Sequence, residues 1–102
     1  MTILITGAAG FIGNNFCIDF AKKYKNTKII SIDNINNYYS KKIKFNRLKR
    51  LKKFKNIKFF KIDLKNKLNL EKIFKRYRFN EVYNFAAQAG VRYSEKNPHA
   101  YI

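Results

Sequence analysis

The sequence predicts an α/β fold in which short apolar strands alternate with helical segments along the whole chain. An apolar run at residues 3–5 leads through a glycine-rich turn into a segment with helical periodicity. Further strands are expected at 28–33, 57–64 and 81–86. This alternation is typical of a parallel sheet with right-handed crossovers. We therefore expect part of a doubly wound sheet, with strand order 3-2-1-4, that stops at the start of a fourth helix.

The first strand and the first helix are both expected to be buried. The run Ile3-Leu4-Ile5 is apolar without interruption, as in a central parallel strand that is covered on both faces. Cys17 has no local base or cation beside it and lies on an apolar helical stripe, so we interpret it as a core residue and not as a nucleophile. The stripe comprises Ile12, Phe16, Cys17, Phe20, Ala21 and Tyr24.

The other helices are less sharply bounded. Residues 41–51 predict a strongly basic helix after the polar, Asn-rich loop at 34–40, but their apolar residues form no clean stripe and leave the helix end open. A third helix is expected at 70–77. Asn97 and Pro98 are typical of an N-cap followed by proline at the first helical position, which predicts a fourth helix just before the end of the chain.

The glycine spacing Gly7-x-x-Gly10-x-x-Gly13 lies between the first strand and the first helix, which is typical of a dinucleotide-binding turn. Asp33 ends the second strand, 20 residues beyond Gly13. A Rossmann fold places there the carboxylate that accepts the ribose hydroxyls of NAD. Since a 2′-phosphate would meet a negative charge, NAD is favoured over NADP as cofactor. The alternative interpretation of Asp33 is a solvated residue at a strand end.

The composition invites a second class of function. The chain has 23 Lys and Arg against 6 Asp and Glu, a net charge of +17, which promotes binding to nucleic acids or anionic surfaces. However, Lys outnumbers Arg, whereas readers of bases and phosphates favour Arg. The abundant Lys, Asn, Ile, Phe and Tyr also share A- or T-rich codons. We attribute the charge to compositional bias and disfavour nucleic-acid binding, but keep a basic nucleotide- or nucleic-acid-binding module, acting through residues 41–53, as the non-enzymatic alternative.

The remaining features bear on location. No apolar run approaches the roughly 20 residues that cross a membrane, so no membrane partner is expected, and a strand that begins at Thr2 is expected to leave no room for a signal peptide. The single cysteine cannot form an internal disulfide, which favours a cytoplasmic location. We predict no metal site.

Three stretches resemble segments of one known family. TGAAGFIG at 6–13 is similar to the cofactor fingerprint of the extended short-chain dehydrogenase/reductase superfamily of NAD-dependent epimerases and dehydratases. DNINNYY at 33–39, followed by Lys44 and Arg47-Leu48, resembles the D-N-x-N-x-Y-Y-x4-K-x2-R-L pattern of UDP-glucuronate 4-epimerases. AAQAGVRYS at 86–94, with NPHAY at 97–101, is similar to a further segment of the same enzymes.

This resemblance implies NAD as cofactor and a UDP-sugar as substrate, with hydride removed from C4 of the hexose and returned to its other face. The implied cofactor-binding residues are Gly7, Gly10, Phe11, Ile12, Gly13, Asp33, Asn34, Asp63, Leu64, Ala86, Ala87 and Gln88. The implied substrate-binding residues are Gly90, Val91 and Arg92. Arg92 either grips an acidic sugar or phosphate in bidentate fashion or braces its own loop.

The family's catalytic Tyr-x-x-x-Lys pair is expected beyond this chain. Two local matches begin at Tyr24 and Tyr38, but both are expected away from the nicotinamide, so we assign no catalytic residue. We therefore interpret residues 1–102 as the N-terminal part of an NAD-binding Rossmann domain without its substrate domain, inactive alone, whose full-length form is a homodimer. Another NAD-dependent sugar-nucleotide epimerase or 4,6-dehydratase is the alternative within the family.

Overall fold

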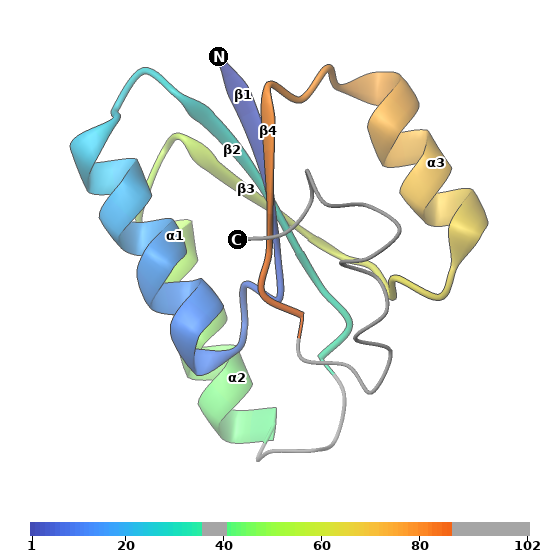
Figure 1. Cartoon of the computed structure of the whole chain (residues 1–102). Coiled ribbons are helices and arrows are strands. Elements are labelled where there is room, and N and C mark those ends of the chain that lie inside the picture. Colours follow the sequence, from blue (N-terminus) through green and yellow to red (C-terminus); the bar gives the residue numbers. More distant parts are fainter. Residues whose placement is uncertain (36–40, 87–102) are drawn as a thin grey trace.

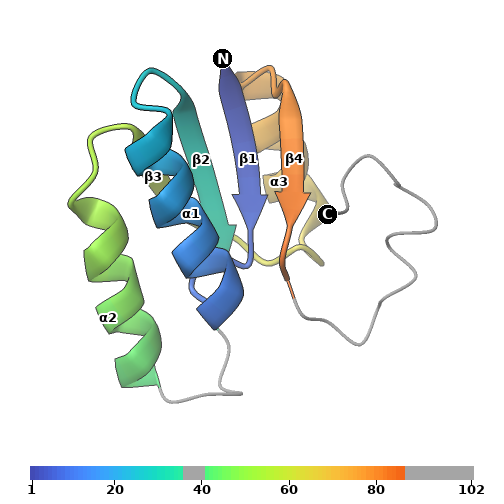
Figure 2. The ribbon, with the colours of Figure 1, turned by 60° about the vertical axis from the view of Figure 1, so that its left-hand side comes forward.

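The computed structural model describes residues 1–35 and 41–86. The elements are β1 (Thr2–Thr6), α1 (Phe11–Lys23), β2 (Lys28–Asp33), α2 (Lys41–Lys52), β3 (Ile57–Lys61), α3 (Lys67–Arg76) and β4 (Glu81–Asn84). The strands pair in parallel in the order β3-β2-β1-β4. Helices α1 and α2 cover one face of the sheet and α3 covers the other (Figure 1; Figure 2). This confirms the predicted Rossmann-like α/β fold and its strand order.

Strand β1 lies inside the sheet and is buried on both faces. Ile3 and Ile5 pack on the side of α1 and α2, in a core cluster that includes Cys17 and Leu51. Leu4 belongs to a separate cluster, which it forms with Ile30, Ile32, Ile62 and Ile73. The two clusters explain the uninterrupted apolar run, because alternate residues of a strand point to opposite faces of its sheet.

Two predicted strand ends are wrong. Strand β3 ends at Lys61 and not at residue 64, because its partner β2 ends at Asp33, which is paired with Lys61. Strand β4 ends at Asn84 and not at residue 86, because its partner β1 ends at Thr6. In both cases the apolar pattern of the sequence continues past the point at which the neighbouring strand offers backbone partners.

Two helix predictions also need correction. Helix α3 begins three residues early, at Lys67, because the side chain of Asn66 accepts the N–H of Asn69 at 3.1 Å and caps the helix. Ile12 is 66% exposed, because the first turn of α1 projects past the end of β1 (Figure 2). The predicted fourth helix lies outside the described residues. No helix in the described parts of the chain is long and apolar enough to cross a membrane.

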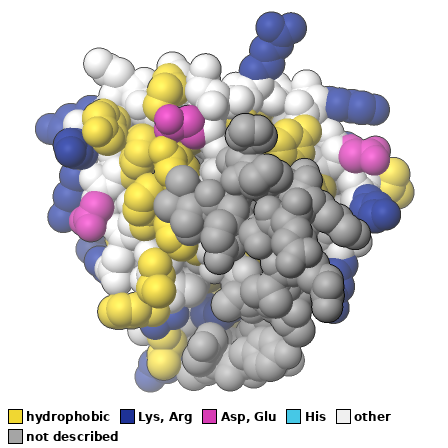
Figure 3. Space-filling view, viewed as in Figure 1, with side chains coloured by type: hydrophobic (Ala, Val, Ile, Leu, Met, Phe, Trp, Pro, Cys, Tyr) yellow, Lys and Arg dark blue, Asp and Glu magenta, His cyan; other side chains and the backbone are white. Residues whose placement is uncertain are grey.

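Strand β4 is the last strand of the described sheet, and its outer edge has no strand partner within residues 1–35 and 41–86. Beside it the rings of Phe16, Phe20, Tyr83 and Phe85 form a cluster, with centroid distances between 4.9 and 5.9 Å. Figure 3 shows hydrophobic side chains gathered on this face beside α1. An apolar edge of this kind offers a template for pairing with a second chain.

We expect the purified 102-residue chain to self-associate more strongly at high than at low salt. The net charge of +17 keeps copies apart at low ionic strength, whereas salt screens that repulsion beyond about 8 Å at physiological ionic strength. Sedimentation velocity at two sodium chloride concentrations measures the effect. A chain that stays monomeric when concentrated in high salt would contradict an available β4 edge.

Candidate functional site

Strand β1 leads into a tight turn in which two glycines are required by the fold itself. Gly7 has a φ of +70°, and a Cβ there would lie 2.5 Å from the carbonyl carbon of Phe85. A Cβ at Gly13 would collide with the carbonyl oxygen of Gly7. Gly7 thus permits both the left-handed backbone and the close approach of the chain after β4, and Gly13 lets α1 pack against the turn.

Gly10 is the least crowded of the three glycines, although a side chain there would press on the turn. Its φ is −78°, and the nearest atom to a Cβ at this position would be the carbonyl oxygen of Gly7 at 3.3 Å. Gly10 is the N-cap of α1 but provides no side-chain cap, and the first turn carries no acidic residue. The amides of Phe11, Ile12 and Gly13 have no acceptor inside the helix. Free amides at a helix N-terminus suit a pyrophosphate, and Gly10 has no side chain that would block its approach.

Asp33 stands at the carboxyl end of β2, directly against the glycine turn. Its Oδ2 accepts the N–H of Ala9 at 3.0 Å, and its Oδ1 accepts the N–H of Ile35 at 2.8 Å. The Nζ of Lys44 lies 3.5 Å from Oδ1, and the two side chains of this ion pair are only 7% and 6% exposed. The carboxylate is therefore fixed where a Rossmann fold places its ribose-binding acid.

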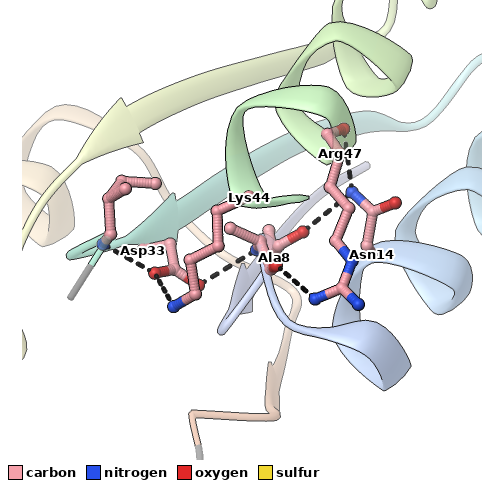
Figure 4. Close-up of polar contacts among 7 residues, drawn as sticks. Ala8, Asn14, Asp33, Lys44 and Arg47 are labelled. Carbon is pink, nitrogen blue, oxygen red and sulfur yellow. Dashed lines mark hydrogen bonds and ion pairs between the residues drawn. The ribbon is translucent and has the colours of Figure 1, made fainter. Parts of the chain in front are cut away.

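Helix α2 is tied to the glycine turn by two further side chains (Figure 4). The Nη1 of Arg47 donates to the carbonyl oxygen of Ala9 at 3.1 Å. The Nδ2 of buried Asn14 donates to the carbonyl oxygens of Ala8 and Arg47, both at 3.0 Å. Its Oδ1 accepts a hydrogen bond from Arg50 at 3.2 Å. These bonds hold α1, α2 and the turn as one unit.

The sequence patterns did not indicate that Asn14, Lys44 and Arg47 connect α2 to the glycine turn and to Asp33. Lys44 and Arg47 lie in the motif that suggested the subgroup, but the motif assigned them no role. Asn14 could have been found from its spacing, because residues 14, 17, 18 and 21 form one buried stripe of α1. A polar residue on such a stripe signals a buried group with hydrogen-bond partners.

The ends of β1 and β4 meet at the point where the crossovers change direction along the sheet, which is where ligands bind in folds of this type. Thr6 donates its hydroxyl to Oδ1 of Asn84, and that oxygen also accepts the N–H of Ala86 at 3.2 Å. The amide nitrogen of Ala86 is among the atoms that a Cβ at Gly7 would meet. The structure thus brings the predicted residue Ala86 to the glycine turn.

Three other predicted residues follow β2 and β3 at the same sheet edge. Asn34 is half-buried next to Asp33. Asp63 is exposed, and its Oδ1 accepts the N–H of Lys65 at 2.9 Å. Leu64 packs against the core cluster on the α3 side. The predicted residues that lie outside the described part of the chain are Ala87, Gln88, Gly90, Val91 and Arg92.

Cys17 is buried in the core, as predicted, and burial raises its pKa from 9.0 to about 12. Because the folded pKa is the higher one, the thiol's contribution to stability is complete below pH 9 and is lost as pH rises toward 12. We expect iodoacetamide at pH 8 to modify the folded chain at least about 100-fold more slowly than the chain in denaturant. Mass spectrometry follows the reaction, and equal rates would place Cys17 outside the core.

Comparison with known proteins identifies the family of the chain. A sequence model of the GDP-mannose 4,6 dehydratase family matches residues 4–102. The chain belongs to this family. Among curated relatives, protein CapI of Staphylococcus aureus is 46% identical over 102 residues, which are 100% of this chain and 30% of CapI. The UDP-glucuronate 4-epimerase of Thermodesulfobacterium geofontis is 41% identical over 99 residues, 97% of this chain and 30% of that enzyme.

Solved structures of epimerases and dehydratases have the same fold. A Bacillus cereus UDP-glucuronic acid 4-epimerase, in complex with UDP-glucuronic acid and NAD, is 30% identical with a TM-score of 0.74, over 97% of this chain and 31% of its own. A Bacillus anthracis dTDP-glucose 4,6-dehydratase, in complex with NAD, is 29% identical with a TM-score of 0.75, over 97% of this chain and 35% of its own. The chain spans about a third of the length of these family members, and its resemblance to NAD-dependent epimerases and dehydratases is confirmed.

Proposed function

We propose that residues 1–102 form the NAD-binding, N-terminal part of a sugar-nucleotide 4-epimerase that interconverts UDP-glucuronate and UDP-galacturonate. The observation that carries the NAD site is Gly10. A Cβ there would have a single neighbour within 4 Å, the carbonyl oxygen of Gly7, so the space beside the free amides of the α1 N-terminus is otherwise open. A dinucleotide pyrophosphate uses both the space and the donors.

With the pyrophosphate at the N-terminus of α1, the other predicted site residues would contact the remaining parts of NAD and the substrate. The ribose of the adenosine half would meet Asp33 and Asn34. The adenine would lie against Asp63 and Leu64, and the chain after β4 would lead toward the nicotinamide through Ala86, Ala87 and Gln88. The substrate would face Gly90, Val91 and Arg92. When bound, NAD would supply a reversible hydride acceptor for C4 of the sugar.

The relatives support UDP-glucuronate as the substrate, because the Thermodesulfobacterium enzyme is named for that reaction and the Bacillus cereus enzyme was solved with UDP-glucuronic acid. A 4,6-dehydratase is the second candidate, favoured by the family description and by the Bacillus anthracis structure. Both candidates use the same NAD site. For the whole protein we propose a homodimer that works in the cytoplasm on a UDP-sugar.

The first experiment is calorimetric titration of the purified chain with NAD and, separately, with duplex DNA over a salt series. We expect saturable binding of NAD. Tight, salt-sensitive DNA binding without NAD binding would favour the basic binding module instead.

The chain itself should not epimerise UDP-glucuronate. Tyr24, which begins one of its two Tyr-x-x-x-Lys matches, caps the end of α1 that lies opposite the glycine turn. Turnover by the 102-residue chain would contradict this proposal.

A chimera tests the substrate. Residues 1–102 would replace the matching N-terminal segment of the Thermodesulfobacterium epimerase, which is 41% identical to this chain. We expect the chimera to convert UDP-glucuronate to UDP-galacturonate, with the parent enzyme as its control. A folded chimera that binds NAD but leaves UDP-glucuronate unchanged would contradict a role for this segment in 4-epimerisation.

A further inference from the structure

The donors around Asp33 form a small anion-binding set that the protein fills with its own carboxylate. Two backbone amides, those of Ala9 and Ile35, and the ammonium group of Lys44 all point at its two oxygens. Ile35 has a φ of +53°, which is rare for a β-branched residue, and its amide donates to Oδ1 at 2.8 Å. The carboxylate can accept about four hydrogen bonds, so capacity remains for a ribose hydroxyl.

Lys44 is the one buried lysine among those of α2 whose side chains are described. Lys42, Lys49 and Lys52 are exposed, whereas Lys44 is 5% exposed and reaches Asp33. A buried ammonium group requires compensation by charge and hydrogen bonds, so its position beside Asp33 is fixed by the fold. Arg47, one turn later on α2, donates to Ala9 and brings a second cation to the same loop.

We propose that Lys44 determines selectivity at the 2′ position of the cofactor ribose, by positioning and neutralising Asp33; this inference rests on the proposed NAD site. Lys44 balances the negative charge of the Asp33 carboxylate. A 2′-phosphate is therefore excluded mainly because the carboxylate already accepts from the two amides and the ammonium group. If the carboxylate were removed, two amides and one ammonium group would face the space that it leaves. Such a donor set suits a phosphate. The preference for NAD over NADP then depends on whether the Asp33 carboxylate or a 2′-phosphate accepts from the two amides and Lys44.

The test is a double-mutant cycle read as the ratio of the dissociation constants of NADP and NAD, measured by titration calorimetry on the full chain. We expect Asp33→Ser to tighten NADP binding at least about tenfold, the scale of one charge-assisted hydrogen bond, and to weaken NAD binding. Adding Lys44→Met should abolish that gain. Lys44→Met alone should raise the ratio further in favour of NAD, because Asp33 then repels a phosphate without compensation. Lys49→Met, which removes an exposed charge from the same helix, should leave the ratio unchanged.

The outcomes separate this inference from the proposed function. If Asp33→Ser gains the same NADP affinity with Lys or Met at position 44, the role of Lys44 is overturned while the NAD site stands. If the folded, unchanged chain binds neither cofactor, both proposals fail. Should the Asp33 variants not fold, the single substitutions Lys44→Met and Lys44→Arg decide. A purely structural role would weaken both cofactors equally, whereas the proposed role changes the ratio in Lys44→Met and preserves it in Lys44→Arg.

Discussion

Replacing Gly7 by alanine is expected to unfold most of the chain, with a loss of about 3 kcal/mol or more of unfolding free energy. The new Cβ would lie 2.5 Å from the carbonyl carbon of Phe85 and 2.6 Å from the amide nitrogen of Ala86, at a φ of +70°. The three atoms nearest to it would all be backbone atoms, so no side-chain rotation can relieve the overlap. Urea denaturation followed by circular dichroism measures the effect.

The matched control is Gly10→Ala, in the same turn. Its Cβ would be 3.3 Å from the nearest atom, and loss of a glycine N-cap costs only about 1 kcal/mol. This variant should fold and yet bind NAD more weakly, because its methyl group enters the proposed pyrophosphate space. Equal destabilisation by the two substitutions would contradict the closer backbone contacts at Gly7 than at Gly10.

Replacing Asn14 by alanine is expected to lower the unfolding free energy by about 2 to 4 kcal/mol, because buried hydrogen-bonding groups lose their partners. The side chain is 1% exposed and donates to the carbonyl oxygens of Ala8 and Arg47 while accepting from Arg50. Alanine would leave the oxygen of Ala8 without this donor and remove one of the contacts that hold α2 to the glycine turn, beside that of Arg47 with Ala9. Thermal and urea denaturation provide the measurement.

The neighbouring Asn15 supplies the control for this second prediction. It is half-buried, and its Nδ2 donates to the carbonyl oxygen of Phe11 at 3.0 Å within the same helix. Its Oδ1 accepts from Arg50 at 3.3 Å, but this bond to α2 is exposed to solvent, which lowers its contribution. Asn15→Ala should change stability by no more than about 0.5 kcal/mol, as for a surface substitution. If both asparagines prove equally dispensable, Asn14 does not hold α2 to the turn.

The fold was predictable because its signals are local. The apolar run at 3–5, the glycine turn and the alternation of strands with helices each lie within one short stretch, and together they lead to the order β3-β2-β1-β4. The ends of β3 and β4 were wrong, since strand length depends on where the neighbouring strand stops. No local pattern carries that information.

The sequence motifs indicate which residues to consider for the candidate site, but not what each of them contacts in the fold. Three glycines of one motif look alike in the sequence, yet a Cβ would collide with backbone at Gly7 and Gly13, whereas at Gly10 it would meet only the carbonyl oxygen of Gly7. The difference arises from Phe85, far along the chain, which crosses beside Gly7. Likewise the pairing of Lys44 with Asp33 depends on how α2 packs against the turn, and no spacing rule predicts that contact.

The most direct test of the NAD site is a titration of the ¹⁵N-labelled chain with NAD, followed by the backbone amide signals in NMR spectra. The site predicts that the largest shifts fall on Gly10, Phe11 and Ile12, at the N-terminus of α1, and on Asp33 at the end of β2. A folded chain whose spectrum does not change with NAD, or changes only on the exposed face of α2 around Lys49, would contradict it.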